Sequence, residues 1–344
     1  MNPVRPLGRN GSSGRPNGVK RLLITGGAGF IGSNFIRYTI NKYPDYRIVN
    51  LDKLTYCGNL ENLKDIEKHK NYRFVKGDIT DASLVGKLAG ESDIIINFAA
   101  ESHVDRSITD PGIFVTTNVF GTYTLLEAAK KAGVELFCQI SSDEVYGSVE
   151  QGSSKETDPL DPRSPYSATK AGADLLVRSY FVTFKLPVII TRSSNNFGPY
   201  QYPEKIIPLF ITNLMAGKKI PLYADGMNMR DWLYVADNCE AIDLVLHKGK
   251  TGEIYNIGIG GETTNLELTR MLLDILGKDE SYIEFVKDRP GHDKRYALDV
   301  FKLKALGWKP RHEFKTALEL TVRWYKDNEA WWHRLAKCRK DIKY

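Results

Sequence analysis

A glycine-rich turn near the start of the chain constrains the fold more than any other feature. The apolar run Arg21–Thr25 has the length and composition of a buried strand, and a helical pattern spans Ser33–Tyr43. Between them the chain reads Thr-Gly-Gly-Ala-Gly-Phe-Ile-Gly. A second apolar run, Arg47–Leu51, ends in Asp52, twenty residues after the last glycine of the turn. This order of strand, glycine turn, helix and acidic residue predicts a dinucleotide-binding unit.

The residues of this unit also indicate which dinucleotide it binds. Gly26, Gly29 and Gly32 let the backbone approach a pyrophosphate, which then lies at the positive end of the helix dipole. The carboxylate of Asp52 can accept hydrogen bonds from an adenosine ribose, and its charge repels a 2′-phosphate. The sequence therefore favours NAD over NADP, although the neighbouring Lys53 slightly weakens this preference.

Short apolar runs alternate with helical patterns over the first half of the chain. We expect further strands at Tyr72–Lys76, Asp93–Phe98, Leu136–Ile140 and Val188–Thr191, and helices at Ser83–Ala89, Ile113–Ala132 and Pro165–Phe184. Such alternation builds βαβ units around a parallel sheet, and right-handed crossovers leave a doubly wound arrangement. The expected fold class is α/β: a doubly wound parallel sheet of the Rossmann type with a smaller C-terminal substrate domain.

The length of 344 residues fits about two domains. Residues 1–19 are rich in Pro, Gly, Ser and Arg, which predicts a disordered basic tail. We expect residues 20–190 to form the NAD-binding domain, with the chain returning to it at about 232–257. Residues 191–231 and 258–344 then form the smaller domain, irregular after Gly258 until one long helix near Thr316–Ala336.

A tyrosine and a lysine four residues apart indicate the chemistry. Tyr166 and Lys170 lie within an expected helix, so their side chains share one face. A tyrosine with its ordinary pKa of about 10 is a poor base at neutral pH. A lysine ammonium and a positive nicotinamide ring would stabilise the phenolate and lower that pKa. Tyr166 could then take a proton from a substrate hydroxyl while hydride leaves the carbon.

Two adjacent carboxyl groups stand at a strand end that should face the ligand crevice. Ser142, Asp143 and Glu144 follow the apolar run that ends at Ile140. Neighbouring carboxyl groups in a closed site repel, so one can keep its proton and act as an acid while the other acts as a base. The alternative is an acidic loop in which Asp143 only caps a helix.

Other strand ends carry residues suited to a flat cofactor. Asp78 can accept a hydrogen bond from an adenine amino group, although a turn aspartate is an equal alternative. Ala99 and Ala100 are small enough to let a cofactor lie close to the strand end. Ser102 follows them and can either contact a ligand or cap a helix.

The glycine turn, the Tyr-Lys pair and the strand order resemble the extended short-chain dehydrogenases/reductases. Six further segments narrow the resemblance to the dTDP-glucose 4,6-dehydratases of that family: residues 52–59, 99–106, 142–147, 195–200, 230–235 and 289–293. The resemblance runs from about Lys20 to at least Asp299. Ser142 stands where that family usually has threonine; its hydroxyl can still bond the sugar O4, but a methyl contact is lost.

The resemblance implies NAD as the cofactor and a nucleoside-diphosphate glucose as the substrate. By position, Tyr166 would be the base at O4 with Lys170 as its partner, Glu144 the base at C5, and Asp143 the acid toward the C6 hydroxyl. Ser142 completes this catalytic set. The implied reaction is oxidation at C4, elimination of water across C5 and C6, and return of the hydride to C6, which yields a 4-keto-6-deoxy sugar nucleotide.

The remaining site residues follow from the matched positions. Cofactor contacts are expected at Gly26, Gly29, Phe30, Ile31, Gly32, Asp52, Asn59, Asp78, Ile79, Ala99, Ala100, Thr117, Tyr166, Lys170 and Asn196. Substrate contacts are expected at Ser102, Ser142, Asn195, Lys205, Arg230, Asn265, Arg289 and Arg295. Arg230 and Arg295 suit a diphosphate because the guanidinium fork meets its oxygens in pairs. No metal is expected.

Three other functions remain open from the sequence. A nucleotide-sugar 4-epimerase would share the fold and Tyr166 but would not need Asp143 and Glu144. The same dehydration could act on UDP-glucose, since the motifs do not separate dTDP from UDP. An NAD-binding sensor or scaffold would need neither an acid nor a base.

Charge and cysteine content restrict partners and compartment. The net charge is +6, but five basic residues crowd the first 21 positions and no long basic stripe follows, so nucleic acid is not expected. The four cysteines are far apart in the sequence, which fits a reducing compartment. The apolar runs are too short for a membrane span and the start lacks a secretory signal, so we expect a cytoplasmic protein. The apolar residues of helices 113–132 and 165–184, such as Leu125, Leu126, Leu175, Leu176 and Val177, predict a homodimer in which these helices pair across a two-fold axis.

Overall fold

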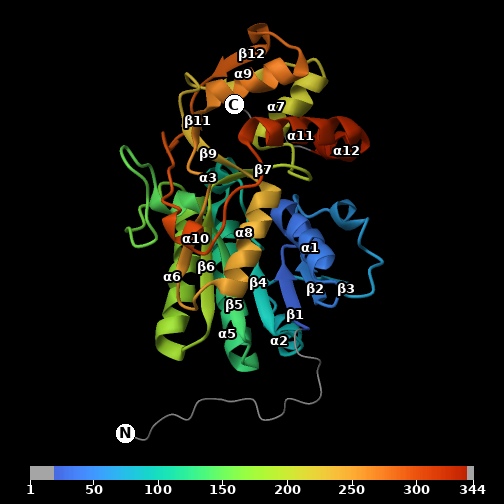
Figure 1. Ribbon diagram of the computed structural model, residues 1–344, viewed down its shortest axis with the longest axis vertical. Helices are drawn as coiled ribbons and strands as arrows, with labels where there is room; N and C mark the ends of the chain where they lie inside the picture. The colour runs from blue at the N-terminus through green and yellow to red at the C-terminus, as the bar shows by residue number, and fades with distance from the viewer. Residues whose placement is uncertain (1–18, 339–344) are drawn as a thin grey trace, which may run out of the picture.

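A seven-stranded parallel sheet forms the centre of the computed structural model, which describes residues 19–338 (Figure 1). The strand order is β10-β6-β5-β4-β1-β2-β3, and every neighbouring pair is parallel. The strands are β1 (Arg21–Thr25), β2 (Arg47–Asp52), β3 (Tyr72–Lys76), β4 (Ile94–Asn97), β5 (Leu136–Ser142), β6 (Val188–Ser193) and β10 (Ile254–Ile257). The order reverses between β1 and β4, the place where such sheets bind ligands. The expected doubly wound fold is confirmed.

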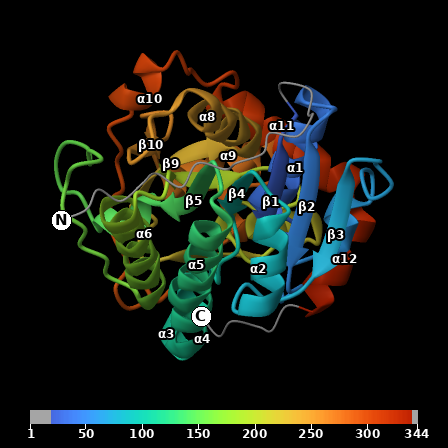
Figure 2. The same ribbon diagram turned by 90° about the horizontal axis from the view of Figure 1, so that it is seen from below.

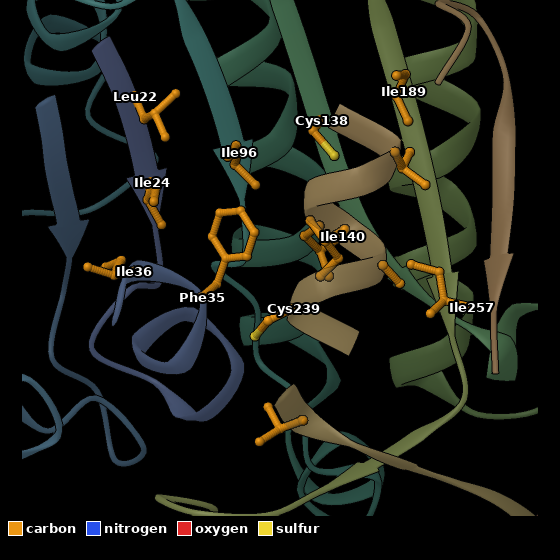
Figure 3. Packing of buried hydrophobic residues seen from close by; sticks show 14 of the residues in the cluster. Leu22, Ile24, Phe35, Ile36, Ile96, Cys138, Ile140, Ile189, Cys239 and Ile257 are labelled. Carbon is orange, nitrogen blue, oxygen red and sulfur yellow. The ribbon is translucent and has the colours of Figure 1, made fainter. Parts of the chain in front are cut away.

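Helices cover both faces of the sheet because successive strand residues point to opposite sides. On one face, α1 (Phe30–Lys42) covers β1, whose Leu22 and Ile24 point toward it, and α8 (Val235–Lys248) lies over β5 and β6 beside Ile140 and Ile189 (Figure 3). On the other face, α2 (Ala82–Gly90), α5 (Thr122–Ala132) and α6 (Pro165–Phe184) lie side by side, as the view from below shows (Figure 2). Their apolar residues form one core with Leu23 of β1 and Phe137 of β5. Because helices bury both faces of the central strands, these strands are rich in apolar residues.

The helix expected at 113–132 contains a local change of winding. It consists of α4 (Pro111–Phe114), a π-helical segment at Val115–Gly121 and α5. Within the π segment the amide of Asn118 exchanges hydrogen bonds with the backbone of Glu101. Such segments often occur at functional sites, and this one brings Thr117 to the wall of a cavity.

A second cluster of elements lies beyond the carboxyl ends of the sheet strands (Figure 1). It has its own apolar core. Its members are β7 (Asn195–Phe197), α7 (Ile206–Met215), β8 (Ile220–Tyr223), β9 (Met229–Tyr234), β11 (Glu262–Thr264), α9 (Asn265–Leu276), β12 (Ile283–Val286), α11 (Phe314–Asp327) and α12 (Glu329–Cys338). The single long helix expected at 316–336 is wrong, because Asn328 separates α11 from α12 and its side chain bonds the Trp324 carbonyl at 2.8 Å. Helix α9 lies in a stretch expected to be irregular.

Short elements complete the described chain: the 3₁₀ turns η1 (Leu60–Leu63), η3 (Asp143–Tyr146) and η4 (Glu280–Tyr282), and the helices α3 (Val104–Thr109) and α10 (Phe301–Ala305). Nearly all of the tail expected at 1–19 lies outside the described residues. Among the helices of residues 19–338, none has the length and apolar character needed to cross a membrane.

Candidate active site

A long cavity lies at the carboxyl ends of the sheet strands and brings together most of the residues expected in the site. Of the expected cofactor contacts, the cavity is lined by Gly26, Gly29, Phe30, Ile31, Gly32, Asp52, Asp78, Ile79, Ala99, Ala100, Thr117, Tyr166, Lys170 and Asn196. Of the other expected residues, it is lined by Ser102, Ser142, Asp143, Glu144, Asn195 and Lys205. Asn59, Arg230, Asn265, Arg289 and Arg295 are not part of its wall.

The glycine turn leaves room that any side chain would fill. Gly26 has a φ of +69°, and a Cβ atom on it would lie 2.5 Å from the Ala99 nitrogen. A Cβ atom on Gly32 would lie 2.4 Å from the Gly26 carbonyl oxygen. Gly29 begins α1 with no side-chain cap, so the N–H groups at this helix end stay available to an anion. These residues fit the pyrophosphate of NAD.

Asp52 ends β2 and lines the cavity. One carboxylate oxygen accepts the Ala28 N–H at 2.9 Å and the other accepts the Leu54 N–H at 2.8 Å. Burial raises its pKa, and these two hydrogen bonds oppose the rise. Each oxygen has a second lone pair, so the carboxylate can still accept ribose hydroxyls. The ammonium of Lys53 is bound to Asp78 at 2.6 Å, which directs this cation away from a 2′-phosphate position.

Tyr166 and Lys170 share one face of α6, as expected, and both are buried. The Lys170 ammonium donates to the Ile140 carbonyl at 2.5 Å, and burial lowers the lysine pKa to about 8. The pKa of Tyr166 is raised, opposite to the expected direction. Burial is the main cause, and the negative charge of Glu144 adds to it. A cationic nicotinamide beside the phenol would act against both effects.

Ser142 ends β5 and organises the two carboxyl groups. Its hydroxyl donates to Asp143 at 3.1 Å and accepts the Glu144 N–H at 3.3 Å, so it caps the turn η3. Burial, with the charge of Glu144, raises the pKa of Asp143 to about 8. Burial also raises the pKa of Glu144, but the positive charges of Lys205, Arg289 and Arg230 oppose the rise. The arrangement is compatible with an acid beside a base, and Asp143 is the stronger candidate for the protonated group.

The three expected arginines have different surroundings. Arg230 is buried, bonds the backbone carbonyls of residues 229, 293 and 294, and lies 4.3 Å from the Tyr296 ring centre. Arg289 lies 3.7 Å from Asp105 and acts with Arg230 on the charge of Glu144. Arg295 is bound by both carboxylate oxygens of Glu262 at 2.5 Å, so its fork is already occupied by an anion.

The two remaining expected residues, Asn59 and Asn265, lie at the starts of helical segments. The side chain of Asn59 accepts the Glu61 N–H at 3.1 Å and caps η1. Asn265 is buried at the start of α9, and its side-chain oxygen has no hydrogen-bond partner. An unpartnered buried oxygen of this kind is costly, and a ligand donor would satisfy it.

Sequence reasoning missed two buried carboxylates that line the cavity, Glu101 and Glu204. Burial raises the pKa of both. The side chain of Glu204 pairs with Arg106 at 3.3 Å. Glu101 lies between Ala100 and Ser102 at a strand end that the sequence did mark, so its position was a usable signal. Glu204 follows no such strand end, and only the folded structure reveals it. Across residues 19–338 no cluster of three or more His, Cys, Asp or Glu side chains is arranged to hold a metal ion.

Comparison with known proteins gives one consistent result. Residues 23–321 match the family model of GDP-mannose 4,6 dehydratase. The low-salt glycan biosynthesis protein Agl12 of Haloferax volcanii is 57% identical over 88% of this chain and 98% of its own length. A dTDP-glucose 4,6-dehydratase of Streptomyces antibioticus is 52% identical over 92% of this chain and 95% of its own length. A crystal structure of DesIV, a dTDP-glucose 4,6-dehydratase of Streptomyces venezuelae with NAD bound, superposes with a TM-score of 0.90. Its sequence is 52% identical, and the match covers 92% of this chain and 99% of DesIV.

Proposed function

The chain belongs to the dTDP-glucose 4,6-dehydratase family, and from this premise we propose how its residues convert a nucleoside-diphosphate glucose into the 4-keto-6-deoxy sugar nucleotide. The protein is a hydro-lyase, dTDP-glucose is the favoured substrate, and NAD is the cofactor. The observation that carries the proposal is that Asp143 and Glu144 line the same cavity as Tyr166. Burial raises the pKa of both carboxyl groups, and three cations oppose the rise at Glu144.

Tyr166 and Lys170 serve the oxidation of C4. The Tyr166 phenolate takes the proton of the sugar O4 hydroxyl, and the Ser142 hydroxyl helps to hold that oxygen. NAD supplies the acceptor for the C4 hydride and later returns it to C6. Lys170 lies one helical turn after Tyr166 on α6, and we assign its positive charge to favour the phenolate. A 4-ketone acidifies the C5–H bond, so the elimination can follow.

Glu144 and Asp143 divide the elimination between them. Glu144 removes the C5 proton, because Lys205, Arg289 and Arg230 favour its ionised form. Asp143 gives its proton to the departing C6 hydroxyl, because it remains protonated near neutral pH. Each of these transfers contributes about 10²–10⁴ in rate. An epimerase has no need for either carboxyl group, since C5 and C6 do not react.

We assign the ligand contacts as follows. The glycine turn and Asp52 hold NAD, with Asp78, Ile79 and Thr117 at its adenosine end. We assign the substrate diphosphate to Arg230 and Arg289, as the resemblance implies; the positive charges of both act on Glu144 of the cavity. Arg295 is a weaker candidate than the sequence implied, because a diphosphate would have to displace Glu262.

The domain division at about residue 190, with a return at 232–257, is also part of the proposal. It is supported by β10, which pairs with β6 in the large sheet, and by the separate apolar core of the C-terminal cluster. A cytoplasmic location is proposed from the free thiols of Cys57, Cys138 and Cys239, which fit a reducing compartment.

We further propose a homodimer through the same helices. Of the apolar residues that suggested it in the sequence, Leu175 is exposed and stays in the proposed interface. Leu125, Leu126 and Val177 are fully buried in the chain's own core, so they cannot meet a partner. Large apolar side chains are instead exposed along the outer sides of the π segment, α5 and α6: Val115, Phe120, Tyr123, Leu175, Val182 and Phe184. A contiguous apolar surface on long helices is typical of a protein interface.

Incubation with dTDP-glucose and UDP-glucose in parallel tests the function. A 4-keto-6-deoxy sugar develops a chromophore in alkali, and we expect it at a higher rate with dTDP-glucose. A C4 epimer without the chromophore would support a 4-epimerase. Faster turnover of UDP-glucose would make UDP-glucose the substrate instead. NAD binding without turnover of either sugar would support an NAD-binding sensor.

A further inference from the structure

The peptide groups on both sides of Ala28, in the middle of the glycine turn, are fixed by residues outside the turn. Its N–H donates to the Asp52 carboxylate at 2.9 Å. Its carbonyl accepts the Asn59 backbone N–H at 3.0 Å and the Asn62 side-chain amide at 2.9 Å. The Ala28 side chain is completely buried. The path of the turn around Ala28, and hence the direction of its N–H groups, depends on these bonds.

Asn62 can make its bond to Ala28 in only one orientation of its amide. The amide nitrogen donates to the Ala28 carbonyl, and the amide oxygen accepts the indole N–H of Trp331 at 2.9 Å. A flipped amide would place oxygen against the carbonyl and N–H₂ against the indole N–H, which loses both bonds. Only 1% of the Asn62 surface is exposed, so water cannot replace either partner. Trp331 therefore determines which way Asn62 points.

Trp331 belongs to α12, 269 residues further along the chain than Asn62. It is buried against Tyr200, which lines the cavity, with 6.0 Å between the ring centres. The guanidinium of Arg37, in α1, lies over the Tyr200 ring, 4.6 Å from its centre. The same guanidinium donates to the Asn62 backbone carbonyl at 2.7 Å. The C-terminal helix is thus connected to the glycine turn by buried, directional contacts.

We propose that Asn62 and Trp331 are positioning residues of the cofactor site, through which the C-terminal helix α12 holds the glycine turn in its NAD-binding form. The inference rests on the proposed role of the turn in binding NAD, but not on the dehydration chemistry. Its consequence is retention of the cofactor. A reaction that stores a hydride on the cofactor and returns it to the same sugar requires that the cofactor stay bound throughout.

The test uses Trp331→Phe, which removes the indole N–H but keeps an aromatic ring. The matched control is Trp332→Phe: Trp332 is equally buried, and its N–H donates to the Tyr325 carbonyl at 2.9 Å without reaching Asn62. Exchange of bound NAD for isotopically labelled NAD is measured on each purified holoenzyme, without sugar. We expect exchange about three- to tenfold faster in Trp331→Phe, the effect of one buried hydrogen bond, and unchanged in Trp332→Phe.

Asn62→Asp provides a second measurement should the tryptophan variant unfold. An aspartate keeps an acceptor for Trp331 but turns an oxygen toward the Ala28 carbonyl, so exchange should accelerate more than in Trp331→Phe. Wild-type exchange rates in both Trp331→Phe and Asn62→Asp would overturn the proposal. Equal acceleration in Trp332→Phe would also overturn it, because the effect would then follow from lost stability alone. Failure of the protein to dehydrate any sugar would leave these binding results interpretable.

Discussion

At the scale of single residues, Asp143 and Glu144 are neighbours in sequence but have different surroundings. Asp143 is buried beside a negative charge and its pKa rises to about 8, whereas three cations favour the charged form of Glu144. A division into one acid and one base was an expectation from two adjacent carboxyl groups, and it stays a prediction because burial raises the pKa of both. The sequence could not predict that the pKa of Tyr166 is raised, because that depends on burial and on the distance of the carboxylates in the folded chain.

Glu144→Gln should separate oxidation from elimination. The amide has no useful basicity toward C5, while Tyr166 and Lys170 are unchanged. We expect 4-keto-6-deoxy product to form at least about a hundredfold more slowly, with exchange of the C5 hydrogen against solvent deuterium reduced in parallel. Glu150→Gln, on an exposed loop, is the control. Dehydration at the wild-type rate in Glu144→Gln would exclude Glu144 as the base.

Asp52→Ala should weaken NAD binding and relax the rejection of NADP. The change removes the ribose acceptor and the negative charge, and it also frees the Ala28 N–H that Asp52 holds. Binding of the two cofactors is compared by titration, with the exposed Asp45→Ala as control. An unchanged preference for NAD would mean that another residue contacts the ribose.

At the scale of elements, the central strands were predictable because both of their faces are buried and they consist largely of apolar residues. The edge strand β3 is only partly buried and still kept enough apolar residues to be predicted. Helix α9 was missed although its start carries a sequence signal, the reciprocal capping of Thr264 and Glu267. The break at Asn328 had no proline or glycine to mark it. Arg295 pairs with Glu262, which lies 33 positions away in the sequence, and neither residue alone indicates this ion pair.

The contact between α1 and α8 should make stability depend on pH. His247 of α8 lies 3.2 Å from Asp243, which also binds Lys42 of α1 at 2.7 Å. The bond to Asp243 is the main cause that raises the pKa of His247. Protonated His247 therefore stabilises the folded state. This contribution is complete at pH values below the ordinary histidine pKa of about 6.5, and it is lost as the pH rises through the raised pKa of the folded state.

The variant His247→Gln should therefore lower the melting temperature more at pH values below about 6.5 than well above the raised pKa. Thermal unfolding across this range measures the difference, and the exposed His333→Gln is the control. A loss of the same size at all pH values would show that His247 contributes by packing rather than by its charge.

At the scale of the whole molecule, the exposed apolar surface on α6 predicts the oligomeric state. Leu175 and Val182 are 59% and 55% exposed. Leu175→Glu should place a charge in the proposed interface and convert a dimer into a monomer, as measured by light scattering at micromolar concentration. Leu320→Glu, on a 40% exposed residue of α11, should leave the dimer intact. A monomeric wild-type protein would contradict the proposed interface.

The whole molecule builds one cavity from two parts. In the proposed mechanism, the sheet domain provides the glycine turn and the catalytic groups. The C-terminal cluster provides positive charges and the helix α12, which we propose holds the glycine turn in place. The central claim is that this cavity removes water across C5 and C6 of the sugar. The most direct test is turnover of dTDP-glucose in deuterium oxide, followed by mass spectrometry and NMR of the product. We predict a 4-keto-6-deoxy sugar nucleotide that carries one solvent deuterium at C5. A product that retains its C6 oxygen and its original C5 hydrogen would contradict the account.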